Sequence, residues 1–180
     1  MKAAIILSTL AVLAGPVRAQ ERIDYAIRGT SATELIGQMR SLGPNSFWAW
    51  TQARYDWRYQ YRQSAGLCHI ASVDVTETIT VTLPRWANRE AGKSCLRTEW
   101  DNMLARLTEH EMGHVSRWSG TRERIRAALL ATPPASSCEA TGKAAKEAGN
   151  AEIRRTQMLQ DAYDRQTNHG LATGVRLHEC

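Results

Sequence analysis

The sequence predicts a single α+β domain, in which a small antiparallel sheet packs on a long helix and on a C-terminal helix. Polar and apolar residues alternate in two stretches, residues 48–61 and 73–83, and this period of two is typical of strands. Apolar residues then recur every three or four positions from about Ser94 to Leu130, which indicates a helix. The length of 180 residues fits one domain, and 43% of hydrophobic residues argues against a largely disordered chain.

The N-terminus has the features of a secretory signal peptide, residues 1–19. Lys2 precedes a mainly apolar run, and small residues stand three before and immediately before a cut after Ala19. We therefore expect residues 20–180 to form the mature chain, secreted or periplasmic. The apolar run is shorter than the ~20 residues that a membrane span needs, so we expect no span after signal removal.

Three elements are expected before the hairpin. Residues 24–29 predict a short strand that ends at a glycine. Ser31 and Glu34 then form a capping box, whose side chains can satisfy each other's backbone N–H groups and open a helix. Gly43 and Pro44 are expected to stop that helix, because neither favours its continuation.

The two alternating stretches predict an antiparallel hairpin with a turn at residues 64–66. The first strand alternates Trp and Tyr with charged or amide residues, and the second alternates β-branched residues with threonines until Pro84, where we expect it to end. The Trp and Tyr side chains could line one wall of a cleft. Core packing explains them equally well.

Two helices are expected after the hairpin. The first runs from about Ser94 to Leu130 with a break near Ser119 and Gly120. The second covers about residues 139–166 and is rich in alanine and charged residues. The four cysteines, at positions 68, 95, 138 and 180, all lie in the mature chain, so an exported protein should form two disulfides. Spacing alone leaves three connectivities open.

The long helix carries the sequence His110-Glu111-Met112-Gly113-His114. Histidines at i and i+4 project from one side of a helix and can both reach one Zn²⁺ ion. Glu111 lies beside them, where it can act as the general base for a zinc-activated water. This HExxH motif predicts a zinc metallopeptidase that hydrolyses peptide bonds.

A catalytic zinc needs a third protein ligand. His169 is the preferred candidate, because it follows the last helix among polar residues. Asp164 is an alternative ligand, or the partner of a ligand histidine's second nitrogen. Glu139 and Glu147 are further alternatives, although neither has a motif around it.

The mature chain resembles a bacterial family of predicted secreted zinc-dependent proteases, the domain of unknown function 922. The resemblance rests on motifs spread over the mature chain: residues 25–29, 34–35, 42–44, the Trp/Tyr stretch, Cys68, residues 83–86, Trp100, residues 110–114, Cys138, residues 163–167 and residues 169–170. It implies a zincin-like fold and a metallopeptidase activity.

The same resemblance implies some pairings and roles. Cys68 and Cys138 match the family pattern and would form one disulfide, which leaves Cys95 and Cys180 for the second. Tyr163 shares a motif with His169 and is a weaker candidate, as an oxyanion donor.

We therefore expect an exported zinc metallopeptidase with a peptide or protein substrate. Two alternatives remain: a non-catalytic zinc-binding module of the cell envelope, and a zinc amidase that acts on peptidoglycan. Nucleic-acid binding is not expected, because removing Lys2 and Arg18 with the leader lowers the formal charge from +5 to +3, with 21 basic residues left against 18 acidic ones.

Overall fold

The computed structural model describes residues 18–180, so the predicted signal peptide lies outside the described residues except for its last two positions. The chain has an α+β fold, as predicted. Its elements are, in order, β1 (Arg18–Ile27), α1 (Ala32–Leu42), η1 (Pro44–Ser46), β2 (Trp50–Ser64), β3 (Leu67–Trp86), η2 (Arg89–Ala91), α2 (Ser94–Trp118), α3 (Thr121–Leu130), α4 (Cys138–Thr167) and η3 (Leu171–Thr173).

None of the helices in this part of the chain combines the length and apolar character of a bilayer-spanning segment.

The sheet has three strands in the order β1-β3-β2. The predicted hairpin is confirmed: β2 and β3 are antiparallel, from Trp50 opposite Thr82 to Ser64 opposite Leu67. The prediction that the whole sheet is antiparallel is wrong, because β1 runs parallel to β3. The chain reverses direction between β1 and β2 and again between β2 and β3, so β1 and β3 point the same way. The sheet is therefore mixed, and β2 is one of its edges.

The hairpin ends at Ala65 and Gly66, near the predicted turn. Both residues have positive φ, 53° and 75°, as a two-residue hairpin turn that follows the strand twist requires. At the other end, Pro84 does not stop β3 as expected. Pro84 lies opposite Tyr25 of β1, while the pairing with β2 ends at Thr82. At Pro84 the strand has a neighbour on one side only, so the missing N–H is tolerated.

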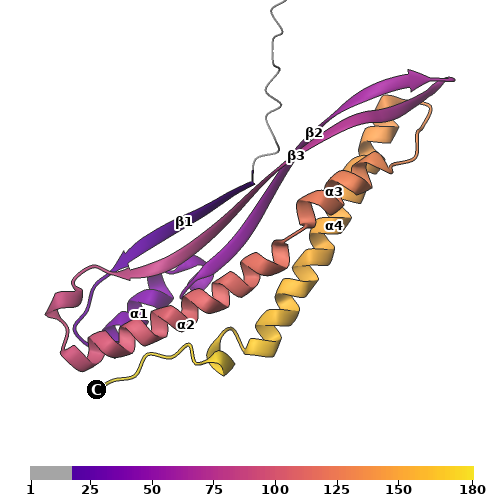
Figure 1. Cartoon of the computed structure of the whole chain (residues 1–180). Helices are drawn as coiled ribbons and strands as arrows, with labels where there is room; N and C mark the ends of the chain where they lie inside the picture. The colour runs from indigo at the N-terminus through magenta and orange to yellow at the C-terminus, as the bar shows by residue number, and fades with distance from the viewer. Residues whose placement is uncertain (1–17) are drawn as a thin grey trace, which may run out of the picture.

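Helices α2, α3 and α4 run along one side of the long hairpin (Figure 1). The predicted break is present: α2 ends at Trp118, and Gly120 takes a left-handed conformation with φ of 74° before α3 begins. The core lies between the sheet and these helices, with α1 covering its wide end. Its fully buried members include Ile27, Leu35, Met39, Ile79, Leu83, Met103, Ile125 and Leu129.

The aromatic residues of β2 face the helices. Alternate residues of the strand are exposed, and those between them, Tyr55, Trp57 and Tyr59, are at least partly buried. The ring of Trp57 lies against Gly149 of α4, and the hydroxyl of Tyr59 donates a hydrogen bond to the carbonyl of Gly142 at 3.3 Å. The rings in the second half of β2 therefore pack on α4, where glycines leave room for them.

Both disulfides implied by the family resemblance are present. Cys68 pairs with Cys138 and fastens the tip of the hairpin to the first turn of α4. Cys95 pairs with Cys180 and fastens the C-terminal tail to the start of α2. Disulfides are typical of an oxidising compartment, which is consistent with an exported protein.

Removal of either disulfide should lower the stability by a similar amount. The two bonds close loops of similar size, with sequence separations of 70 and 85, and the entropy of an unfolded loop varies only with the logarithm of its length. The double variants Cys68→Ala/Cys138→Ala and Cys95→Ala/Cys180→Ala should each lose about 2 to 5 kcal/mol of unfolding free energy. Urea unfolding of both variants measures this loss, and an unchanged midpoint in either would contradict it.

Candidate metal centre

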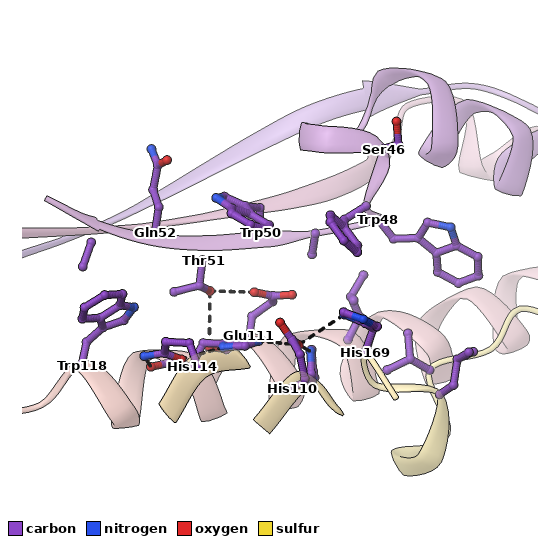
Figure 2. A pocket seen from close by; sticks show the side chains of 18 of the residues that line it. Ser46, Trp48, Trp50, Thr51, Gln52, His110, Glu111, His114, Trp118 and His169 are labelled. Carbon is purple, nitrogen blue, oxygen red and sulfur yellow. Dashed lines mark hydrogen bonds and ion pairs between the residues drawn. The ribbon is translucent and has the colours of Figure 1, made fainter. Parts of the chain in front are cut away.

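Helix α2 brings the three residues of the HExxH motif to one buried place. His110, Glu111 and His114 are 5%, 4% and 8% exposed, on the side of α2 that faces β2 and α4. The two histidines lie one helical turn apart, and their ring centroids are separated by 4.9 Å. Figure 2 shows all three side chains between the strand above and the helices below. The arrangement expected from the spacing is confirmed.

Asp164 of α4 lies against both histidines. Its Oδ1 is 3.3 Å from Nε2 of His110 and 3.1 Å from Nε2 of His114. Each of these three residues offers one ligand atom, and the three atoms lie within 4.8 Å of one another. Asp164 was expected either as an alternative ligand to His169 or as the partner of a ligand histidine, and it lies at the centre of the cluster.

His169 lies at the edge of the same cluster. Its Nδ1 is 3.6 Å from Oδ1 of Asp164, and its side chain is 53% exposed. His169 therefore remains a candidate ligand, although it is less enclosed than the other three. Glu139 and Glu147, the remaining alternatives, are exposed residues in the N-terminal half of α4 and lie outside the cavity described below.

Gln160 fixes the orientation of the His114 ring. Its amide nitrogen donates to the backbone carbonyl of His114 at 3.3 Å, and its amide oxygen lies 2.7 Å from Nδ1 of the ring. This orientation requires a proton on Nδ1, because an oxygen cannot donate. In a neutral ring Nε2 is then a lone pair that faces the carboxylate of Asp164. The contact needs either a second proton on the ring or a cation between the two groups.

Asp164 and His114 each stabilise the charged form of the other. Burial alone would raise the pKa of Asp164, but hydrogen bonds to His110 and His114 outweigh it and hold that pKa well below its usual range. Burial opposes charging of His114, yet its bonds to Asp164 and Gln160 leave its pKa above the usual value. Nδ1 of His110, also buried, has no partner among the described residues.

Thr51 of β2 holds Glu111 over the cluster. The Thr51 hydroxyl donates to Oε2 of Glu111 at 2.7 Å, as the dashed line in Figure 2 marks. Burial raises the pKa of Glu111, and the Thr51 bond and the two histidines offset only part of the rise. Glu111 is thus a positioned carboxylate with increased proton affinity, which is the property of a general base.

The ring of Tyr163 packs against both histidines of the cluster. It stacks on His110, with centroids 5.0 Å apart and an angle of 17° between the planes, and the guanidinium of Arg117 covers its face at 3.4 Å. The hydroxyl lies against Gly113, where a Cβ atom would overlap the ring. Tyr163 does not line the cavity, so its position gives no support to a role as oxyanion donor.

The end of α4 places His169. Asn168 and His169 both have positive φ, 47° and 51°, and Gly170 follows at 83°, so the chain turns sharply after the helix. The hydroxyl of Thr167 accepts the N–H of Gly170 at 3.4 Å. A side chain at Gly170 would overlap Val175 and approach the ring of His110. The turn therefore packs on the face of α2 that carries His110.

The cluster opens into a cavity of about 330 Å³ between β2 and the helices. Only Trp50 of the Trp/Tyr stretch in β2 lines it, together with Trp48 just before the strand. Phe47 stacks on Trp50 at 5.6 Å and lies 5.4 Å from the ring of His169. The cavity also has lining residues from α1, α2, α4 and the tail: Arg40, Leu107, His110, Glu111, His114, Trp118, Gln157, Gln160, Asp164, His169, Leu171 and Val175.

Thr51 and Gln160 belong to the site, although neither was predicted from the sequence. Gln160 stands one helical turn before Asp164, and together with Thr156 and Thr167 it forms a buried polar stripe on α4. That helical spacing is a signal that could have been found. Thr51 has no comparable signal, because it meets Glu111 only through the packing of β2 over α2.

Replacement of Gly113 by alanine should destabilise the protein. The new methyl group would displace Tyr163, whose ring is held by His110 and Arg117, at a cost of about 1 to 3 kcal/mol. Gly37→Ala is the matched control: Gly37 lies in α1 with open space around it, so alanine should raise stability by up to about 1 kcal/mol. Urea unfolding measures both, and an increase for Gly113→Ala would contradict the packing role of Tyr163.

Comparison with known proteins places the chain in a family. The family model described as bacterial protein of unknown function (DUF922) matches residues 23–170. No curated protein matches the chain. No solved structure matches it either. The match includes every residue of the cluster and most of the described chain, and the chain belongs to this bacterial family of unknown function.

Proposed function

We propose that the protein is an exported zinc-dependent metallopeptidase with a zincin-like site. The observation that carries the proposal is the buried cluster of His110, His114 and Asp164 beside Glu111, at the wall of a cavity. A peptide or protein is the substrate, and the two disulfides support a place of action in the periplasm or outside the cell.

The donor set fits zinc. Two imidazoles and a carboxylate form one of the ligand sets typical of catalytic zinc. The bond from Gln160 leaves Nε2 of His114 free to coordinate and supplies the outer partner that ligand histidines usually have. A cation between Nε2 of His114 and the carboxylate of Asp164 would satisfy this contact, as a second proton on the ring also would. We assign His110, His114 and Asp164 as ligands and keep His169 as the competing candidate for the third position.

When bound, zinc would polarise a substrate carbonyl and lower the pKa of a water molecule toward ~7. The residues of the chain orient the reacting groups and transfer the protons. Thr51 holds Oε2 of Glu111, so that the carboxylate meets the cavity in one orientation. Glu111 takes a proton from the attacking water and returns it to the departing amine. Leu107, Trp118 and Val175 supply apolar parts of the cavity wall.

The first test separates catalysis from metal binding. Glu111→Gln should keep about one zinc per chain and lose cleavage of a general protein substrate by at least about 100-fold, because the proton acceptor is gone. His110→Ala should lose the zinc itself. Zinc content by atomic emission and release of peptides from casein measure the two properties.

Glu109→Gln is the matched control for Glu111→Gln, since Glu109 is an exposed residue of the same helix. It should keep both zinc and cleavage. Full zinc retention in His110→Ala would reject the metal site. A wild-type protein that binds zinc and cleaves neither casein nor peptidoglycan would instead be a binding module, and cleavage of peptidoglycan alone would indicate an amidase.

The second test decides the third ligand. Loss of a true ligand should lower zinc affinity far more than the 10- to 100-fold that is typical of an outer partner. We expect Asp164→Ala to cause the larger loss and His169→Ala the smaller, because Asp164 contacts both histidines and His169 is half exposed. Competition with a zinc chelator measures both affinities, and the reverse order would assign His169 as the ligand.

A further inference from the structure

The cavity extends to both sides of Glu111. Figure 2 places Trp118 and Gln52 on one side of this residue, and Ser46, Trp48 and His169 on the other. A bound chain could therefore contact the protein on both sides of the bond that is cut.

The two sides differ in charge. Apart from Glu111 and the candidate metal ligands, Arg40 is the one charged residue among those that line the cavity. Arg40 lies in the last turn of α1, six residues before Ser46, so it belongs to the side of Ser46 and Trp48. Within residues 18–180, no carboxylate lies within 4.0 Å of its guanidinium as an ion pair.

Aromatic and aliphatic residues line the cavity together with Arg40, among them Phe47, Trp48 and Leu171. Arg40 is itself exposed, so its guanidinium is open to an incoming anion. A guanidinium also matches the two oxygens of a carboxylate with two parallel hydrogen bonds.

We propose that Arg40 binds a carboxylate of the substrate, so that the cavity takes peptides with a negative charge on the His169 side of the cleaved bond. This inference rests on the proposed peptidase function. The carboxylate has two sources, the free C-terminus of a short peptide or an acidic side chain of a longer one. Trp118 and Gln52 on the other side carry no charge, so we expect a neutral or apolar residue there.

Two pairs of peptides, built on one parent sequence with a single aromatic residue, test the proposal. In the first pair, one peptide ends in a free carboxylate and the other in an amide. In the second pair both peptides are amidated, and they carry either Glu or Gln two positions after the aromatic residue. Binding is measured by quenching of intrinsic Trp fluorescence, since Trp50 and Trp118 line the cavity. Cleavage by the zinc-loaded protein is measured in parallel as KM and kcat.

The carboxylate peptides should bind about threefold to tenfold more tightly than their neutral partners, the range expected of a partly exposed bidentate pair. Arg40→Gln should abolish this preference through KM, and Arg40→Glu should reverse it. Arg126→Gln, an exposed arginine of α3 outside the cavity, should keep it. A preference for the free terminus identifies the first source, and a preference for Glu identifies the second.

The outcomes separate the inference from the proposed function. Equal binding of charged and neutral peptides, or an unchanged preference in Arg40→Glu, overturns the role of Arg40 even if the peptides are cleaved. A carboxylate preference that depends on Arg40 in a protein that cuts no peptide supports the role of Arg40 and rejects the peptidase. Absence of binding by all four peptides overturns the inference.

Discussion

The contact between α2 and α4 at Gly113 is the constraint on which the candidate site depends. Because Gly113 has no side chain, the ring of Tyr163 can lie on the backbone of α2 and stack against His110. The position of Tyr163 thereby fixes where α4 lies along the axis of α2. The next residue, Asp164, then meets both histidines, and Gln160 reaches His114 from one turn earlier. One close approach between two helices thus aligns every group that α4 contributes.

The sheet completes the site from the opposite side. Residue Thr51 stands at the start of β2, where the strand passes over α2, and holds the carboxylate of Glu111. The far half of the same strand packs its rings on α4 over Gly142 and Gly149. A single strand therefore touches the site at one end and anchors α4 at the other. The disulfide between Cys68 and Cys138 secures that anchor.

Local patterns predicted the parts of the molecule that depend on local physics. The i, i+4 spacing of His110 and His114 placed both on one buried face, and the α2 to α3 break was visible at Gly120. The direction of β1 could not be predicted, because it depends on how the chain returns after α1. The rings of β2 had two consistent interpretations, and only the position of α4 decides between them. Asp164 and His169 are five residues apart: the packing of α4 at Gly113 directs Asp164 to the histidines, and the sharp turn after Thr167 places His169.

The candidate site draws on nearly the whole length of the described chain. Thr51 comes from its first third, the histidines from its middle and Asp164 from near its end, and the tail that packs on His110 is fastened by the last residue, Cys180. A chain that emerges N-terminus first holds the two histidines long before it holds their partners. The cluster can form only after α4 has emerged. The order of residues along the chain therefore delays assembly of the site until synthesis has passed Asp164.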